Sequence, residues 1–325
     1  MQCSIFRRGL VFAGLAASMS GAFAQTAHWP TKAVKIVVPY AAGGPADITA
    51  REIAQKLSTL TGQPFVIENQ GGAMGIPSLM AVSRSDPDGH TMWMPALGNA
   101  VLQPLLSKQG GAEHLAKLRP VGMVTTSAHV LVVSSKLPVS NVKELIEYAQ
   151  AHPGQLAFAS AGVGGTAHLG AELFKSLSRT DVVHVPYKGT APAISDLASG
   201  RVGAMFSSLP SLQGAIDKGL VRLLAATSAS KSPATKSLPL MSAALPGFDY
   251  TSWYAMYVPL KTPSAVVARI NALMQQTLKD PGLAGRIEAH GMEPLPTGPE
   301  EVDVWVKRDQ EKWGAVIRTA KITLD

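Results

Sequence analysis

Residues 34–51 read VKIVVPYAAGGPADITAR, and this stretch predicts a β-strand, a glycine turn and the start of a helix. β-Branched residues favour a buried strand, and Gly43 and Gly44 free the turn after it from side-chain clashes. Pro45 suits the first turn of a helix, and Asp47 complements the positive end of the helix dipole. Because such a turn points unpaired backbone N–H groups beyond the end of its strand, we expect it to receive an anion.

The order of strand, small-residue loop and helix recurs along the chain, which favours an α/β fold. Short β-rich runs bounded by turn residues predict strands at 65–68, 91–94, 156–159, 182–185, 204–207 and 223–226. Helices are predicted between most of them, and this alternation is typical of parallel sheets. A second glycine turn, SAGVGG at 160–165, precedes a predicted helix at 166–177 that Thr166 is expected to cap.

Two long extended passages, at 121–133 and 253–259, bracket the central block of the chain. A chain that leaves one domain and later returns must cross twice, so these passages predict two crossing strands between two domains. We expect a first and a second domain, formed by residues 25–127 with 253–325 and by residues 128–252. The helical pattern at 299–319 is expected to pack back on the first domain.

The first 24 residues predict an export signal that is not part of the fold. Arg7 and Arg8 precede an apolar run of about ten residues, and the sequence AFA at 22–24 is a small-x-small cleavage site. The run is well below the ~20 residues that span a bilayer. We predict cleavage after Ala24 and a periplasmic mature protein that does not insert into the membrane. Cys3, the only cysteine, leaves with the signal, which excludes disulfides and thiolate chemistry from the mature chain.

The remaining composition indicates a binding protein rather than an enzyme. The net charge is +7, but the basic residues are scattered, which argues against nucleic acid and fits a mild attraction for small anions. The motifs G-x-S-x-G and H-E-x-x-H are absent, and no histidines have the spacing of metal ligands. We therefore predict no catalytic residues, no metal site and no cofactor.

One glycine pattern leaves an oxidoreductase open as the alternative function. Gly162-x-Gly164-x-x-Ala167 follows a predicted strand and opens a helix, as a dinucleotide-binding fingerprint does. The pattern does not lie in the first strand–helix unit, however. The following strand leads from Val185 into Pro-Tyr-Lys and not into the acidic residue that binds a ribose. A lone glycine pattern of this kind is a weak signal.

Two polar residues at predicted helix starts each have two interpretations. Asp47 is placed to receive a ligand amine, or to stabilise its helix end and pair with Arg51 four residues on. His168 is placed to donate a hydrogen bond to a carboxylate, or to serve as a buried structural residue. Both pairs of alternatives stay open at the level of sequence.

Five segments together resemble a known family of receptors. PYAAGGPADITAR, ENQGGAMG, SAGVGGTAHLGAELF, HVPYKGTAPAISDLASGRV and WYAMYVPLKTP are similar, in order and spacing, to the Bug (TctC-like) substrate-binding proteins of tripartite tricarboxylate transporters. The resemblance runs through essentially the whole mature chain. It implies a two-domain type II periplasmic binding protein fold, with a mostly parallel sheet flanked by helices in each domain and two crossing strands. It also implies capture of a small carboxylate (amino acid, di- or tricarboxylate, or aromatic acid) by a monomer that serves membrane permease subunits.

The resemblance also implies which loops hold the ligand. The loop at 40–47 matches the first carboxylate loop of the family, the loop at 160–168 faces it, and 187–189 forms a third wall. Pro45 and Ala46 stand where family members often carry Ser-Thr, so two hydroxyls are missing from the polar part of the site. The segments Ala41-Ala42 and Ala159-Ser160-Ala161 are likewise small and apolar, which suggests a less polar or bulkier ligand. The ligand-binding residues predicted in this way are Tyr40, Ala42, Gly43, Gly44, Asp47, Gly98, Asn99, Ser160, Ala161, Gly164, Gly165, Thr166, His168, Tyr187, Lys188 and Gly189.

Overall fold

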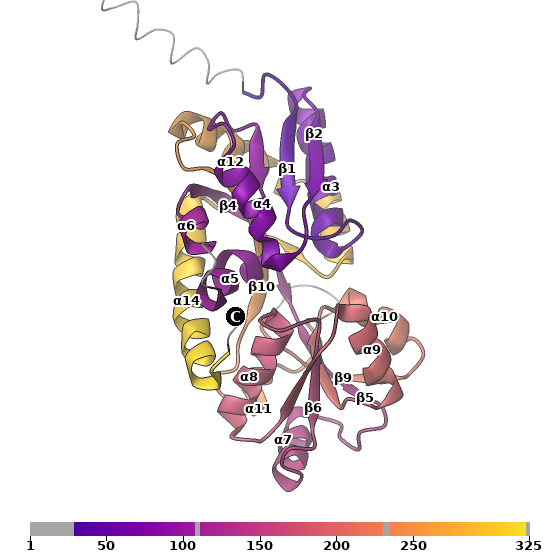
Figure 1. Cartoon of the computed structure of the whole chain (residues 1–325). Coiled ribbons are helices and arrows are strands. Elements are labelled where there is room, and N and C mark those ends of the chain that lie inside the picture. Colours follow the sequence, from indigo (N-terminus) through magenta and orange to yellow (C-terminus); the bar gives the residue numbers. More distant parts are fainter. Residues whose placement is uncertain (1–28, 108–110, 230–234, 323–325) are drawn as a thin grey trace, which may run out of the picture.

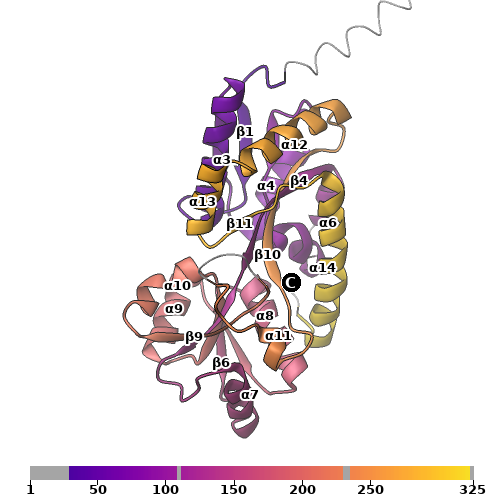
Figure 2. The same ribbon diagram turned by 180° about the vertical axis from the view of Figure 1, so that it is seen from behind.

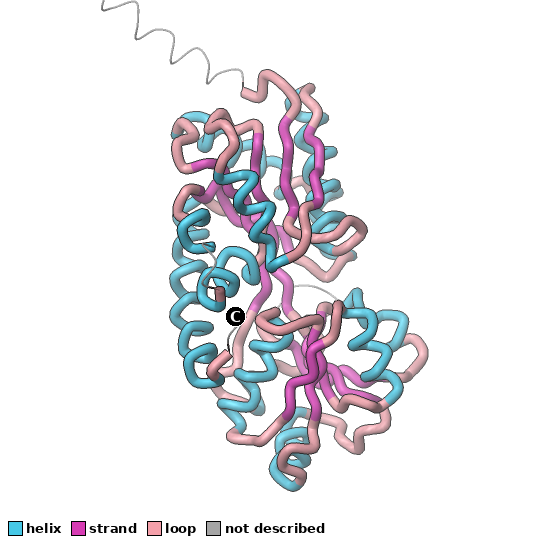
Figure 3. The backbone as a smooth tube through the Cα atoms, viewed as in Figure 1, coloured by secondary structure: helices cyan, strands magenta, loops and turns pink. Residues whose placement is uncertain are grey.

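The structure is a computed structural model that describes residues 29–107, 111–229 and 235–322 (Figure 1). It has two α/β halves, each built on one sheet, and the loops of the two halves face each other across the middle of the molecule (Figure 3). The predicted export signal lies outside the described residues. Among the described helices, none has both the length and the apolar character that crossing a bilayer requires.

The first half contains a six-stranded sheet with the strand order β11-β4-β10-β3-β1-β2. In chain order these strands are β1 (Val34–Val38), β2 (Phe65–Asn69), β3 (Thr91–Trp93), β4 (Leu118–Ala128), β10 (Thr251–Pro259) and β11 (Glu293–Pro294). Strand β1 runs parallel to β2 and β3, whereas β10 runs antiparallel to β3 and β4. Its helices are α3 (Pro45–Thr61), α4 (Ile76–Ser83), α5 (Gln103–Leu106), α6 (Gly111–Leu115), α12 (Ser264–Leu278) and α13 (Pro281–Ala289), with the short helical turns η1 (Ala73–Gly75) and η2 (Gly98–Leu102).

The second half contains a five-stranded sheet with the strand order β7-β6-β8-β5-β9. Its strands are β5 (Val130–Ser134), β6 (Ala157–Ser160), β7 (Val183–Pro186), β8 (Ala204–Ser207) and β9 (Val221–Ala226). Its helices are α7 (Val142–Ala151), α8 (Thr166–Ser178), α9 (Thr190–Ser199), α10 (Leu209–Ile216) and α11 (Met241–Ala244). Strand β6 is parallel to β7 and β8, but β5 is antiparallel to β8 and β9. Most strands of each sheet therefore run in one direction, as expected, because only β10 and β11 in the first sheet and β5 in the second run the other way.

The stretch at 34–51 folds as its residues predict. Buried Val34, Ile36 and Val38 place β1 in the core, and α3 begins at Pro45 after the glycine turn. Apolar residues at helical spacing on α3 pack into the core beneath it, and Gly62 ends the helix in a left-handed conformation. Helix α8 forms as expected, but Thr166 does not cap it: Gly165 is the N-cap and Thr166 is the first helical residue.

The extended run predicted at 121–133 is two strands, because the chain turns from one sheet to the other at His129. The His129 N–H donates to Oγ1 of Thr227 at 3.0 Å, and the Thr227 N–H donates to the carbonyl of His129 at 2.9 Å. The N–H of Tyr250, just before β10, also donates to the carbonyl of Thr227. Three chain segments therefore meet where the two halves join.

The C-terminal helix α14 (Pro299–Ala320) lies along both halves, on the left edge in Figure 1 and on the right edge in Figure 2. Its 22 residues are about 33 Å long at 1.5 Å per residue, which is long enough to reach both sheets. It packs on β4 of the first half and on α8 of the second. The helix therefore packs on the first half, as the sequence predicts, and it also reaches the second half, which the sequence did not indicate.

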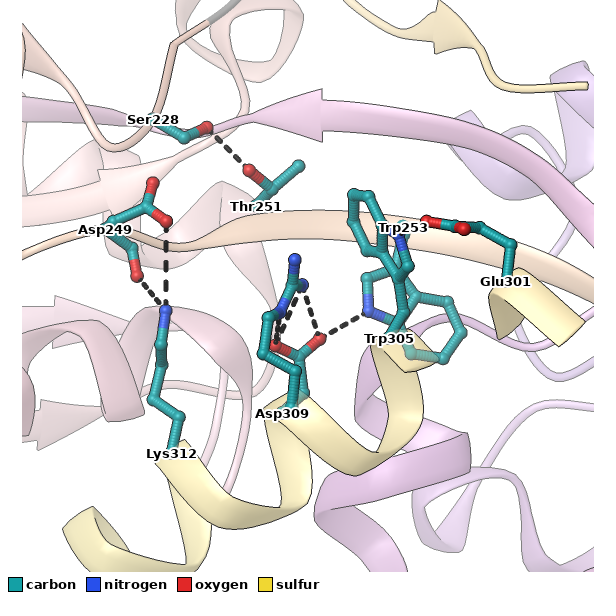
Figure 4. Close-up of polar contacts among 9 residues, drawn as sticks. Ser228, Asp249, Thr251, Trp253, Glu301, Trp305, Asp309 and Lys312 are labelled. Carbon is teal, nitrogen blue, oxygen red and sulfur yellow. Dashed lines mark hydrogen bonds and ion pairs between the residues drawn. The ribbon is translucent and has the colours of Figure 1, made fainter. Parts of the chain in front are cut away.

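Polar contacts fasten α14 to β10 and to the segment that leads into it (Figure 4). Oδ2 of Asp309 accepts a hydrogen bond from the indole N–H of Trp253 at 2.7 Å, and Asp309 also pairs with Arg308. One turn further on, the ammonium of Lys312 donates to the carbonyl of Asp249. The buried Trp313 ring packs edge-on against Tyr250, with 5.6 Å between ring centroids. One apolar cluster therefore continues from Trp93 in the first half, through Trp253 and Trp313, to Phe206 in the second.

Candidate functional site

A cleft of about 830 Å³ lies between the two halves. Helices α3, α9 and α10, whose N-caps line it, lie on the other side of the ribbon from α14 (Figure 1). The loops that follow β1, β2 and β3 line it from the first half, and the loops that follow β6, β7 and β8 line it from the second. The crossing strands form its floor. Parallel strands direct the loops at their carboxyl ends to one edge of a sheet, which is where α/β proteins bind ligands.

The first glycine loop, between β1 and α3, is held by Asp47, which does not line the cleft. Gly43 has a left-handed backbone (φ +83°), Gly44 is the extended N-cap, and the helix starts at Pro45. Oδ2 of Asp47 accepts hydrogen bonds from the Gly43 N–H at 2.8 Å and from Nε of Arg51 at 3.0 Å. Burial acts to raise the pKa of Asp47, but hydrogen bonds from Arg51 and Gly43 outweigh it and hold the pKa below its ordinary value. Asp47 is therefore an ionised, internally paired residue.

The second loop repeats this backbone geometry with a different side chain. Gly164 is left-handed (φ +76°), Gly165 is the extended N-cap, and the helix starts at Thr166. The third helical residue is His168, whose Nδ1 accepts the Gly164 N–H at 3.0 Å. His168 thus occupies the position in α8 that Asp47 occupies in α3, and both side chains are buried.

A second histidine and a serine support His168. The rings of His168 and His184 are stacked, with 3.7 Å between centroids, and burial lowers the pKa of both residues to about 4. Near neutral pH both rings are therefore uncharged, which allows Nδ1 of His168 to act as an acceptor. Oγ of the fully buried Ser160 lies 2.6 Å from Nε2 of His184 and accepts the Gly162 N–H at 3.2 Å. These three side chains fix the shape of the loop from inside the fold.

The two helix starts leave backbone donors free at the cleft. The first hydrogen bonds within the helices are those from Ile48 to Gly44 and from Leu169 to Gly165. The N–H groups of the residues before Ile48 and Leu169 have no partner within their helices. Pro45 has no N–H, so the first loop offers one donor fewer than the second. Both helix starts carry a partial positive charge toward the cleft.

Asn99 joins three loops of the first half. Its Oδ1 accepts hydrogen bonds from the Tyr40 hydroxyl at 2.7 Å and the Ala96 N–H at 3.1 Å, and its Nδ2 donates to the carbonyl of Met74 at 2.9 Å. A Cβ on Gly75 would lie 2.7 Å from Nδ2 of Asn99, so this packing requires glycine. Both polar atoms of the Asn99 side chain therefore help to shape the cleft wall.

The floor of the cleft carries neutral polar side chains from the crossing strands. Ser127 on β4 pairs across the sheet with Ser252 on β10, and the hydroxyl of Ser127 donates to the carbonyl of Gly291 at 3.0 Å. Tyr254 lies two residues after Ser252, on the same face of β10. Nδ1 of His129 is buried without a hydrogen-bond partner in the described part of the chain, and burial lowers the pKa of His129 to about 4. Burial also raises the pKa of Tyr254 to about 12.

Ten of the sixteen predicted ligand-binding residues line the cleft. The predicted residues that line it are Tyr40, Ala42, Gly43, Gly44, Gly98, Asn99, Ala161, Gly165, Thr166 and Gly189. The predicted residues that do not line it are Asp47, Ser160, Gly164, His168, Tyr187 and Lys188.

Each of these six residues has another position or partner. Asp47, Ser160, Gly164 and His168 take part in the hydrogen bonds behind the two loops. The Tyr187 hydroxyl donates to Oδ2 of Asp196 at 2.8 Å, and Lys188 is exposed. For Asp47 and His168 this geometry favours the structural interpretation over direct ligand contact.

Five other residues that line the cleft lie in the loops predicted at 40–47 and 160–168: Ala41, Pro45, Ala46, Gly162 and Val163. The residues that did not follow from the sequence are Met74, Ala96, Ser127, His129, Thr190, Ser208, Ser252, Tyr254, His290 and Met292. A signal existed for the floor. Ser252 and Tyr254 are polar residues two apart on β10, so they lie on one face, and Ser127 near the end of β4 is followed two residues later by His129. No sequence pattern indicated His290 and Met292, which follow α13 near the short strand β11.

Comparison with known proteins gives a family for this chain. Residues 49–322 match the family model described as the tripartite tricarboxylate transporter family receptor. Protein BugT of Bordetella pertussis is 31% identical over 309 residues, which cover 94% of this chain and 93% of BugT.

Two solved structures are similar over most of the chain. Rpa4515 of R. palustris, solved with adipate, has a TM-score of 0.81 and 33% identity, covering 91% of this chain and 99% of that one. MatC (Rpa3494) of Rhodopseudomonas palustris, solved with bound malate, has a TM-score of 0.75 and 28% identity, covering 89% and 100%. The two sheets, the crossings between them and the match over residues 49–322 agree: the chain belongs to the tripartite tricarboxylate transporter receptor family, whose members are solute-binding receptors.

Proposed function

We propose that this protein is a periplasmic receptor that captures a small carboxylate in the cleft and delivers it to the permease of a tripartite tricarboxylate transporter. The observation that carries the proposal is the pair of glycine loops, one per half, which have the same backbone geometry and line one cleft. Each ends in a helix N-terminus with free N–H groups, the arrangement that suits a carboxylate best.

The related structures support the choice of ligand. Adipate in Rpa4515 and malate in MatC are both carboxylates, and both proteins are similar to this chain over about nine-tenths of its length. We propose two domains with the bounds given above, except that α14 extends along both. Hinge motion at His129 and Tyr250 would bring the two loops together around the ligand.

The geometry of the second loop does not favour a nucleotide cofactor. A dinucleotide loop uses backbone N–H groups to hold a pyrophosphate. Here the Gly164 N–H is bonded to His168 behind the loop, and the matching family is one of solute-binding receptors. The pattern at 162–167 is therefore better explained as a wall of the carboxylate cleft.

Calorimetry tests the proposal directly. The mature chain, residues 25–325, is unfolded and refolded to remove any co-purified ligand, and is then titrated with mono-, di- and tricarboxylates, amino acids, aromatic acids and NAD(P). We expect at least one carboxylate to bind and to raise the melting temperature, as ligand linkage requires. Failure of every carboxylate, or stabilisation by NAD(P) alone, would contradict the proposal.

A further inference from the structure

The chain makes a tight corner at residues 290–292, where α13 ends. The N–H of Gly291 donates to the carbonyl of Glu288, and the N–H of Met292 donates to the carbonyl of Ile287. Gly291 itself has a left-handed backbone (φ +69°). This is the Schellman arrangement that ends many helices, and the buried side chains of Ile287 and Met292 belong to one apolar cluster, a contact that often accompanies it. The corner therefore has a defined shape that α13 sets.

Two further contacts attach the corner to the first half. The hydroxyl of Ser127, near the end of β4, donates to the carbonyl of Gly291 at 3.0 Å. Ser127 lies two residues before His129, where the chain turns from one sheet to the other. The hydroxyl of Thr49 on α3 points to the sulfur of the buried Met292, 3.5 Å away. The corner therefore belongs to the first half and moves with it.

The corner packs against the second half at the edge of the cleft. A Cβ added to Gly291 would lie 3.0 Å from Cδ and 3.1 Å from Cγ of Pro210, in the first turn of α10. Carbon atoms in ordinary contact are about 3.5–4.0 Å apart, so a side chain at this position would push the two segments apart. His290 and Ser208, close in sequence to the two contacting residues, both line the cleft. In Figure 2, α13 lies above α10 on the same side of the ribbon.

Glycine meets two requirements at position 291. The left-handed backbone alone would admit asparagine, which also occurs at this position of helix ends. The close approach of Pro210 is what excludes a side chain. At the end of α3, Gly62 has the same left-handed backbone (φ +72°), but a Cβ there would meet nothing within 4 Å. Comparison of the two glycines therefore separates the ending of a helix from the contact between the halves.

We propose that the corner at 290–292 and the start of α10 form a latch that holds the two halves together at the cleft. Helix α14 packs on both halves and lies on the other side of the ribbon from α10, so rotation about α14 separates the corner from α10 (Figure 1). The apparent affinity of a receptor scales with the fraction of molecules in the binding-competent state. The latch therefore raises ligand affinity although neither Gly291 nor Pro210 lines the cleft.

A distance measurement across the cleft tests the latch. Residues 25–325 contain no cysteine, so two introduced cysteines can be labelled with a donor and an acceptor fluorophore without side reactions. Gln55 on α3 and Ser195 on α9 are exposed, lie in different halves and do not line the cleft. Energy transfer between labels at Gln55→Cys and Ser195→Cys therefore reports the separation of the two halves.

Three variants of the labelled chain are compared with the wild type. Gly291→Asn keeps the left-handed backbone but adds a side chain at the contact, and we expect lower transfer efficiency and about tenfold weaker binding of adipate. Gly62→Asn makes the same exchange at the end of α3 and should leave both quantities unchanged. Pro210→Ala removes Cγ and Cδ of the ring, so its combination with Gly291→Asn should recover part of the transfer efficiency and of the affinity.

The possible outcomes separate the latch from the proposed function. Unchanged transfer efficiency in Gly291→Asn, or an equal decrease in Gly62→Asn, overturns the latch. Weaker adipate binding by Gly291→Asn at unchanged transfer efficiency also overturns it, because position 291 would then act on the ligand and not on the separation of the halves. If adipate does not bind to the wild type, the energy transfer alone decides about the latch, whereas the calorimetric panel decides about the carboxylate receptor.

Discussion

Asp47 and His168 play the same structural role with different side chains: each accepts a hydrogen bond from the loop before its helix. Each is the third residue of its helix, and each accepts the N–H of the left-handed glycine four residues earlier. Arg51 neutralises the carboxylate of Asp47, and burial keeps His168 neutral, so neither presents a net charge to the cleft. The two side chains therefore hold the shape of their loops through hydrogen bonds to the glycine N–H groups.

Substitution of Asp47 tests this role at the residue scale. Asp47→Ala removes the acceptor of the Gly43 N–H, so we expect weaker ligand binding and a loss of about 1–3 kcal/mol in the free energy of unfolding. Asp47→Asn keeps an acceptor oxygen and should retain more of both. Calorimetry and urea unfolding measure the two effects. Wild-type affinity in Asp47→Ala would show that the loop does not depend on this hydrogen bond.

At the scale of elements, the starts of α3 and α8 differ by one backbone N–H donor. Position one of α3 is Pro45, which lacks an N–H, and position one of α8 is Thr166, which has one. Proline fits the first position of a helix, and Gly165 already has the extended backbone that precedes a proline. The two positions can therefore be exchanged without breaking either helix.

Substitutions at these two positions should change carboxylate affinity in opposite directions. Thr166→Pro should weaken carboxylate binding by about tenfold because it removes a backbone donor, whereas Thr166→Ala keeps the donor and controls for loss of the hydroxyl. Pro45→Ala adds a donor to the first loop and should tighten binding by several-fold. Calorimetry with the best carboxylate reads out all three variants. Equal affinities for Thr166→Pro and Thr166→Ala would contradict the use of backbone donors here.

At the scale of the whole molecule, α14 joins the halves on the side opposite the cleft. The buried cluster through Trp253, Tyr250 and Trp313 is continuous across both sheets, while the cleft separates the loops of the two halves. We expect a molecule joined in this way to open and close by rotation about its packed side.

A substitution on α14 tests this connection. Trp313→Ala creates a cavity in the shared core, and we expect a loss of about 3–5 kcal/mol in the free energy of unfolding and separate unfolding of the two halves. Trp305 on the same helix is partly exposed and lies under Arg308, so Trp305→Ala should cost about 1 kcal/mol and preserve a single transition. Urea unfolding followed by fluorescence and circular dichroism distinguishes these results. A single, little-changed transition in Trp313→Ala would contradict the shared core.

The buried histidines make stability depend on pH. The pKa values of His129, His168 and His184 are about 4 in the folded protein, below the ordinary value of about 6.5 in an unfolded chain. Between these values the unfolded chain binds more protons, so stability is complete above pH ~6.5 and falls as the pH decreases toward 4. Each unit of pKa difference contributes about 1.4 kcal/mol.

Denaturant unfolding at pH 7, 6, 5 and 4 measures this slope. His184→Gln removes one titrating group while keeping a polar partner for Ser160, so its slope over the same range should be smaller. A slope identical to that of the wild type would contradict the assignment of this pH dependence to the stacked pair.

The sequence by itself determined the local parts of this protein. The strand, glycine turn and helix at 34–51 follow from steric limits on β-branched residues, glycine and proline, which act over a few residues. The recurrence of this unit at 157–178 and the α/β class followed from the same rules. The left-handed Gly43 and Gly164 are the places where these limits are strictest.

Only the tertiary structure decided which side of each loop faces the ligand. Asp47 and His168 were candidates for the ligand, yet they point behind their loops because Gly43 and Gly164 offer them N–H donors there. The floor residue Ser252 was missed, and it reaches the cleft because β10 lies beside β4, more than a hundred residues earlier in the chain. The reach of α14 to both halves likewise depends on buried contacts with distant segments. Local sterics determine the elements, but long-range packing determines what each element faces.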